Sequence, residues 1–133
     1  DNLALSELDK KPIRYIVDDC VKFVLREQRR GNTYDAIIMD PPSYGRGKSG
    51  EVWKMEKDIY NLILECSKIM TKNPLFFLIN SYTTGLSHVV MDNMIKSIIM
   101  PKYNGKVRGD TLCIPIQNSK SYLPCGTSSR WER

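Results

Sequence analysis

Three short runs rich in apolar residues alternate along the chain with stretches in which apolar residues recur every three or four positions. The runs occupy residues 14–17, 34–39 and 75–79. A short, continuous apolar run is typical of a strand that is buried on both faces of a sheet. We therefore expect three strands at these positions, with helices between them.

The helical stretches carry recognisable start and stop signals. Asp19 can cap a helix whose apolar positions recur as far as Gly31, a residue that commonly ends helices. A second helix is expected within residues 53–72, before the Asn-Pro pair that breaks it, and a third within residues 87–101, where Ser87 can cap the first turn.

This alternation of strands and helices predicts an α/β fold with a mostly parallel sheet and helices on both faces. Beyond residue 101 the pattern weakens. Residues 102–108 and 111–116 are expected to form an antiparallel strand pair that turns at residues 109–110. We expect one domain over residues 1–122 and a polar tail over residues 123–133, together with a surface loop at residues 43–50.

The composition of the chain suits a folded domain that does not span a membrane. The 133 residues are 41% hydrophobic, and none of the apolar runs is long enough to cross a bilayer. The formal net charge of +5 and the sequence pI of about 9.0 permit nucleic-acid binding but suit an ordinary basic surface equally well. Because the chain begins with Asp1 rather than Met, we expect it to be a piece of a longer protein.

The cysteines do not form a metal-binding pattern. Cys20, Cys66, Cys113 and Cys125 are widely scattered, and His88 is the only histidine, so no metal site is predicted. Free cysteines of this kind fit a protein of the reducing cytoplasm. The two that fall in expected helices, at positions 20 and 66, are interpreted as buried thiols.

The strongest chemical signal stands where the strand at residues 36–39 ends. Asp40 is followed by Pro41 and Pro42, which lack backbone N–H groups and therefore cannot continue a central strand. Ligands of open α/β sheets bind just outside the carboxyl ends of the strands, which is where Asp40 is expected. The motif could also serve only to terminate the strand.

Three segments, at residues 16–23, 34–45 and 75–85, together resemble a known family. They are similar to the C-terminal half of class I S-adenosylmethionine-dependent methyltransferases with a Rossmann-like fold. Among these, the segments are most similar to the ribosomal-RNA methylases of the large-subunit cytosine type. The resemblance extends to about residue 122 and implies that the protein is a methyltransferase.

The resemblance implies roles for residues on the cofactor side. The carboxylate of Asp19 would receive the adenine amino group of S-adenosylmethionine, with Asp18 beside it and the backbone of Cys20 bordering the ring. Asp40 would also border the cofactor, near the transferred methyl group. Alternatively, the acids at positions 18 and 19 have only a structural role, as a helix cap and the residue next to it.

The resemblance also implies an acceptor side. Asp40, Pro41 and Pro42 would frame the methyl group and the acceptor base, and Tyr44 would stack on that base. Four more residues would contact the substrate: Ser43, Arg46, Lys48 and Asn80. Alternatively, residues 43–48 form a solvated surface loop, and the amide at position 80 satisfies nearby backbone groups.

The chain departs from the family pattern in two ways. The glycine-rich loop and the ribose-binding acid of the family precede the segments found here, so about half of the cofactor site is absent and the fragment alone is expected to be inactive. Residues 80–82 read Asn-Ser-Tyr where the 5-methylcytosine enzymes carry a nucleophilic cysteine. Transfer to a nitrogen or an oxygen would need only positioning and proton removal.

The missing strands also affect the sheet. In the family the strand at residues 14–17 is separated from the strand at 36–39 by the two absent strands, so open edges remain. We expect residues 14–17 to pair with residues 36–39, to pair with another copy of the chain in a homo-oligomer, or to be displaced.

Together these features predict S-adenosylmethionine-dependent methyl transfer to RNA, with ribosomal RNA as the expected substrate, and no membrane or metal partner. The alternative is a non-catalytic nucleic-acid-binding or assembly module built on a methyltransferase-like scaffold.

Overall fold

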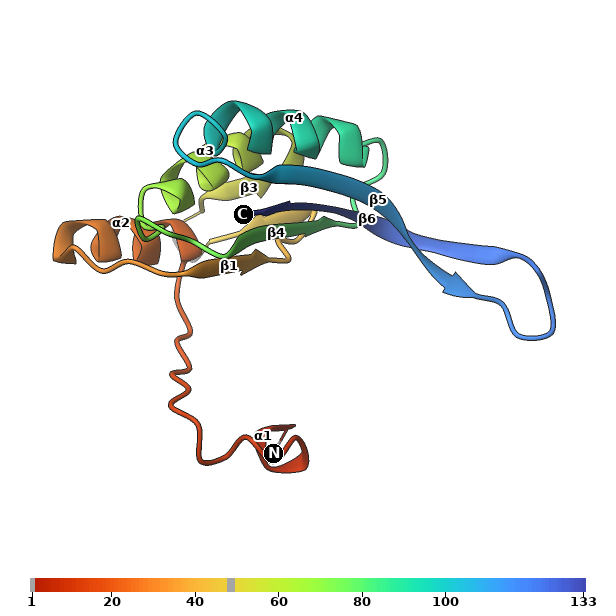
Figure 1. The fold of residues 1–133 in the computed structure, drawn as a ribbon, viewed down its shortest axis with the longest axis horizontal. Helices are drawn as coiled ribbons and strands as arrows, with labels where there is room; N and C mark the ends of the chain where they lie inside the picture. Colours follow the sequence, from red (N-terminus) through yellow and green to blue (C-terminus); the bar gives the residue numbers. More distant parts are fainter. Residues whose placement is uncertain (1, 48–49) are drawn as a thin grey trace.

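The computed structural model describes residues 2–47 and 50–133 and consists of a four-stranded sheet covered by helices, with a small separate hairpin (Figure 1). In chain order the elements are α1 (Asn2–Leu5), α2 (Cys20–Arg30), β1 (Ala36–Met39), β2 (Tyr44–Arg46), β3 (Val52–Lys54), α3 (Met55–Ser67), β4 (Phe76–Ser81), α4 (His88–Ile98), β5 (Lys106–Pro115) and β6 (Tyr122–Glu132).

The sheet has the strand order β1-β4-β6-β5. β1 pairs with β4 in parallel, with Met39 opposite Ile79, whereas β6 runs antiparallel to both of its neighbours. Three of the four strands therefore share one direction, and β6 opposes them. This arrangement confirms the predicted mostly parallel sheet with an antiparallel pair of strands at the C-terminal end of the chain.

The sequence-based assignment of the last 30 residues is wrong in detail. Residues 102–108 and 111–116 do not form a hairpin that turns at 109–110; β5 runs straight through Gly109 and pairs with β6. The stretch predicted as a polar tail is β6 itself, inserted between β4 and β5. Only Ser129 and Trp131 of β6 are buried, so its sequence carries almost no apolar signal.

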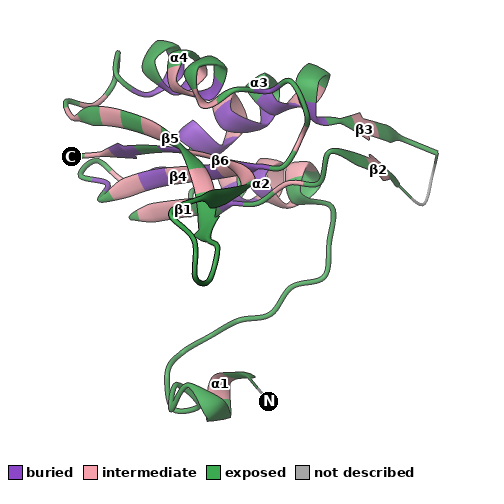
Figure 2. Ribbon diagram, turned by 90° about the vertical axis from the view of Figure 1, so that its right-hand side faces the viewer, coloured by how far each residue is buried: buried purple, intermediate pink, exposed green. Residues whose placement is uncertain are grey.

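The three longer helices pack on one face of the sheet, as Figure 2 shows for α3 and α4. α2 joins the same layer, because the Gln28 side chain donates a hydrogen bond of 3.0 Å to the Glu65 carbonyl of α3. Along β4, Phe77 and Ile79 are buried while the alternate residues are half-buried. Of the helices predicted for both faces, the described residues therefore supply those of one face, and Ile38 on the other face is 65% exposed.

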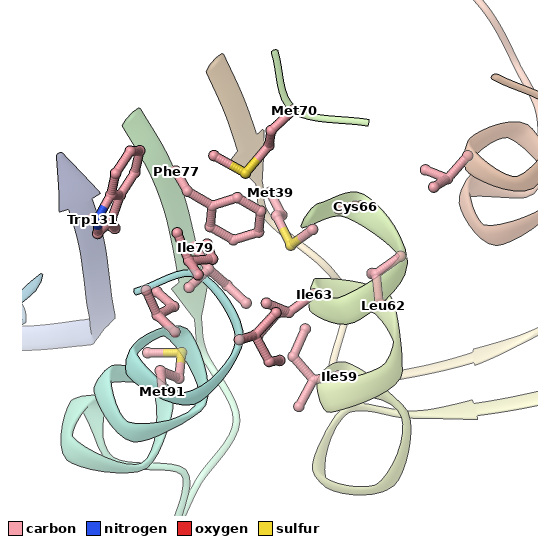
Figure 3. Close-up of a cluster of buried hydrophobic side chains, with 14 of the residues drawn as sticks. Met39, Ile59, Leu62, Ile63, Cys66, Met70, Phe77, Ile79, Met91 and Trp131 are labelled. Carbon is pink, nitrogen blue, oxygen red and sulfur yellow. The ribbon is translucent and has the colours of Figure 1, made fainter. Parts of the chain in front are cut away.

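The core lies between this helical layer and the sheet (Figure 3). Phe77 of β4 and Trp131 of β6 are opposite each other in the sheet and fully buried. Ile63 of α3 and Met91 of α4 cover them, and neither is exposed. Burying each of the phenylalanine, isoleucine and methionine side chains stabilises the fold by roughly 1.5–3 kcal/mol, so this cluster holds the helical layer against β4 and β6.

Helix α2 begins and ends where the sequence predicts. The Asp19 carboxylate accepts a hydrogen bond of 3.0 Å from the backbone N–H of Lys22, and Gly31 adopts a left-handed conformation with φ 71°. At α4, Ser87 occupies the capping position, but within the described residues its side chain makes no capping hydrogen bond.

Two local predictions are wrong. Part of the expected loop at residues 43–50 is strand β2, which pairs with β3 in a hairpin. Residues 14–17 are not a strand: they are exposed and lead away from the sheet towards α1 (Figure 1). Of the three outcomes expected for this segment, displacement is the one observed, and among the described strands β1 pairs only with β4.

Candidate active site

The loops that follow β1 and β4 meet at the carboxyl edge of the sheet. These two strands are parallel and adjacent, so their carboxyl ends lie side by side. The Thr83 hydroxyl, two residues beyond β4, donates a hydrogen bond of 2.8 Å to the Ser43 hydroxyl, four residues beyond β1. The segment that contains Asp40 is thereby tied to the segment that follows Asn80.

A tryptophan from β3 fixes the proline segment in place. The Trp53 indole N–H donates a hydrogen bond of 2.7 Å to the Pro42 carbonyl. The next carbonyl, that of Ser43, accepts a bond of 3.0 Å from the Met55 N–H at the start of α3. The Pro42 carbonyl therefore has a protein donor already, which the sequence did not predict.

The remaining acceptors of this segment are open. The exposed carboxylate of Asp40 and the carbonyl of Pro41 accept no hydrogen bond from the described residues. A carboxylate and a carbonyl oxygen can each accept a hydrogen bond from an amino group. The segment thus offers unoccupied acceptors to a ligand at residues 40 and 41.

The predicted aromatic and basic residues lie on the hairpin. Tyr44 and Arg46 both belong to β2, and the Arg46 guanidinium donates a bond of 2.7 Å to the Tyr44 hydroxyl. The hairpin projects from the helical layer (Figure 2). Lys48 lies outside the described residues. The structure therefore pairs Tyr44 with Arg46, and the stacking role of Tyr44 stays a prediction.

A second exposed aromatic residue was missed by sequence reasoning. Tyr82 directly follows β4 and is 56% exposed. Its ring lies against the backbone of Gly126 in β6, where an added Cβ would come within 2.8 Å of the ring. The sequence could have indicated this residue, because an aromatic side chain directly follows a buried strand. Since β1 and β4 are parallel neighbours, Tyr82 lies at the same sheet edge as Asp40.

Asn80 shares a sheet face with Ser128, its partner in β6, rather than with the buried side chains of β4. Its side chain makes no hydrogen bond to another described residue. This placement puts the amide on the face of the sheet opposite the helices.

The first turn of α2 holds the second group of predicted residues. The Asp18 carboxylate accepts hydrogen bonds from Arg26 and, at 2.8 Å, from the N–H of Asp19. The bond from Arg26, more than any other interaction, lowers the pKa of Asp18. Asp18 therefore has its own partners, and we assign no ligand contact to it.

Asp19 keeps one oxygen open. Oδ1 accepts the capping bond from Lys22, and Oδ2 has no partner among the described residues. The N–H groups of Cys20 and Val21 in the same turn also lack backbone acceptors there. An acceptor beside free N–H donors matches the amino group and ring nitrogens of adenine, so these residues fit that end of S-adenosylmethionine.

Cys20 itself differs from the prediction. Cys20 is exposed rather than buried, because it is the first residue of α2. Cys66, within α3, is buried as expected. Burial raises the pKa of the Cys66 thiol to about 12.

An ion pair connects α2 to the hairpin. The Lys22 ammonium lies 3.0 Å from a carboxylate oxygen of Glu51, and this bond raises the pKa of Lys22. Both side chains are about half exposed, so solvent screens the attraction between them. Together with the bond from Trp53 to Pro42, the ion pair joins the first turn of α2 and the proline segment to one hairpin.

Comparison with known structures defines the class of fold. The chain superposes on the crystal structure of a SAM-dependent methyltransferase from Agrobacterium tumefaciens with a TM-score of 0.88 and 33% sequence identity. The match covers 98% of this chain and 43% of that protein. The chain thus has a class I methyltransferase fold and corresponds to less than half of that protein's length.

Comparison of sequences narrows the resemblance. Ribosomal RNA large subunit methyltransferase I of Salmonella newport is 38% identical over 48 residues, which is 36% of this chain and 12% of the relative. Ribosomal RNA large subunit methyltransferase K/L of Chromohalobacter salexigens is 34% identical over 64 residues, 47% of this chain and 8% of the relative. No family model matches the chain. These findings confirm the resemblance to large-subunit ribosomal-RNA methyltransferases, although the chain spans only a small part of their length.

Two further observations concern other kinds of partner. No helix in the described part of the chain is both long and apolar enough to span a bilayer. Among residues 2–47 and 50–133, no three histidine, cysteine or acidic side chains are grouped where they could hold a metal ion.

Proposed function

We propose that the protein to which this chain belongs transfers a methyl group from S-adenosylmethionine to RNA, and that its substrate is ribosomal RNA. The observation that carries the proposal is the arrangement around one hairpin. The hairpin joins the open acceptors at Asp40 and Pro41, at the carboxyl edge of the sheet, to the first turn of α2, in a fold shared with a SAM-dependent methyltransferase. The names of the sequence relatives support RNA as the substrate class.

On the cofactor side, Asp19 would accept a hydrogen bond from the adenine amino group, and the N–H groups of Cys20 and Val21 would donate to ring nitrogens. S-Adenosylmethionine supplies an electrophilic methyl group. The residues of this chain orient the adenine end, and the glycine loop and ribose-binding acid expected from the family would hold the rest.

On the acceptor side, the Asp40 carboxylate and the Pro41 carbonyl would accept hydrogen bonds from an amino group of the target base. These hydrogen bonds would orient the nitrogen lone pair and provide an acceptor for the proton that the nitrogen releases. Tyr82 and Tyr44 are the aromatic residues available to stack on the base, and Arg46 the cation available to its phosphate. Because residues 80–82 contain no cysteine, we propose a nitrogen acceptor.

The proposal extends to the other expectations about the protein. Residues 1–122, together with β6, would form the C-terminal part of a catalytic domain that acts in the cytoplasm, where ribosomal RNA is available. Pairing of copies through the open edge of β1 stays a prediction, which the molecular mass in solution would test.

The test compares two variants of the full gene product on RNA from cells that lack the gene, with a labelled methyl donor. Asp40→Asn changes the acid after β1, and Asp35→Asn is the matched control before β1, where Asp35 accepts a bond of 3.0 Å from Thr71. We expect Asp40→Asn to lower the rate at least about tenfold and Asp35→Asn to leave it nearly unchanged. Unlabelled RNA with the unchanged protein would favour the non-catalytic module instead.

A further inference from the structure

A hollow lies at the amino edge of the sheet, opposite the candidate active site. It has a volume of about 200 Å³ and lies between the turn before β4, the turn before β5 and the end of β6. Its lining consists of Lys72, Asn73, Pro74, Lys102, Tyr103, Asn104, Trp131 and Arg133. Since β4 begins here and ends at the candidate active site, the two places are separated by the length of that strand.

The lining is cationic and contains no acidic side chain. Lys72, Lys102 and Arg133 contribute three positive charges, and none of them forms an ion pair with a carboxylate in the described part of the chain. The Lys102 ammonium donates a bond of 3.1 Å to the Ser67 hydroxyl, a neutral partner that orients it without cancelling its charge. The nearby acid Glu132 is paired with Arg130 at 3.0 Å.

A buried donor in the wall has no acceptor. Trp131 is fully buried, and its indole Nε1 finds no hydrogen-bond partner among the described residues. Tyr103 packs against the indole with a ring-centroid distance of 5.7 Å, and Gly105 lies so close that a Cβ there would come within 2.5 Å of Nε1. Buried donors are nearly always satisfied, so this N–H calls for an acceptor that no described residue supplies.

We propose that this hollow binds a phosphate group. Every polar side chain in the lining can donate a hydrogen bond, and a phosphate offers only acceptors and negative charge. The group could be free phosphate or a phosphodiester of RNA, since both present the same oxygens. This inference does not rest on the proposed methyl transfer, because the hollow shares no residue with the carboxyl edge of the sheet.

The test uses the two indole N–H resonances of the ¹⁵N-labelled chain, which contains only two tryptophans. The variant Trp53→Phe removes one resonance and so assigns the other to Trp131. We expect the Trp131 resonance to shift and saturate during titration with inorganic phosphate, while the Trp53 resonance stays in place. Chloride at matched ionic strength should leave both unchanged.

Paired substitutions locate the site. Lys72→Gln with Lys102→Gln should weaken binding at least about tenfold, since two charge-assisted contacts are lost. Lys57→Gln with Lys96→Gln removes the same charge from exposed positions on α3 and α4 and should leave binding unchanged. Amide spectra of both variants verify that they are folded.

A short single-stranded RNA distinguishes the source of the phosphate. If RNA moves the Trp131 resonance at far lower concentration than phosphate does, the site takes the RNA backbone; if phosphate alone moves it, the site takes the free ion. A Trp131 resonance that responds to neither ligand would overturn the proposal. Equal weakening by the two lysine pairs would also overturn it.

Discussion

Replacing Trp53 by Phe tests whether the indole N–H holds the proline segment in place. Phe keeps a ring at this half-buried position, where the tryptophan packs beside Gly45, but removes the donor that lies 2.7 Å from the Pro42 carbonyl. A hydrogen bond of this kind contributes about 1 kcal/mol net. With an m value of roughly 1.5 kcal/mol/M in urea, the unfolding midpoint should fall by about 0.7 M.

The assay is urea unfolding, monitored by tryptophan fluorescence. In Trp53→Phe the one remaining tryptophan is Trp131, which is fully buried and therefore reports on the core. Trp53→Leu is the comparison, since it loses both the donor and the ring and should lower the midpoint further. A midpoint for Trp53→Phe equal to that of the unchanged chain would show that the bond to Pro42 contributes nothing, and the reasoning would be refuted.

Three further predictions concern stability and reactivity. Hydrogen bonds from Tyr34 and other neighbours lower the pKa of Glu27 to about 2 from an ordinary 4.5. The stability that this carboxylate provides is therefore complete above about pH 4.5 and is lost as the pH falls towards 2. The urea midpoints at pH 6 and pH 3 should differ less in Glu27→Gln than in the unchanged chain. Cys66 should react with a thiol reagent at pH 8 only after unfolding, and a fast reaction in the native chain would contradict its burial. Gly109→Ala should lower stability by about 1–3 kcal/mol, because the new methyl group would overlap the Asp92 carboxylate that bonds to a buried serine; an unchanged thermal midpoint would count against this packing.

The parts of the fold that the sequence predicted are those with local causes. α2 begins with the capping bond of Asp19 and ends at the left-handed Gly31, and both depend only on neighbouring residues. β1 ends where the two prolines make further pairing impossible, which is why Asp40 was expected at a strand end. The parallel pairing of β1 and β4 follows from the helix between them.

The parts that the sequence did not predict depend on distant partners. β6 is a polar sequence that became an inner strand because β4 and β5 both offer it hydrogen bonds, and only Ser129 and Trp131 had to be buried. Residues 14–17 have a strand-like composition but find no strand to pair with among the described residues.

The candidate site likewise combines residues that local motifs indicate with contacts that depend on distant partners. Asp40 and Asp19 were identified from local motifs. The bond from Trp53 to Pro42 and the bond from Thr83 to Ser43 join residues 11 and 40 positions apart, so no local pattern indicates them. The same holds for Tyr82, whose ring rests on Gly126 of a strand that sequence analysis had assigned to the tail.

The most direct test of the central claim is calorimetric titration of S-adenosylmethionine into the full gene product and its Asp19→Ala variant. We expect binding by the unchanged protein and a loss of affinity of about tenfold or more in the variant, since a charge-assisted hydrogen bond to adenine is removed. Asp58→Ala is the matched control, because Asp58 likewise accepts a backbone N–H at the start of a helix, at 2.7 Å from Lys54, but lies on α3. Equal affinities in all three proteins, or no binding by any of them, would contradict the account.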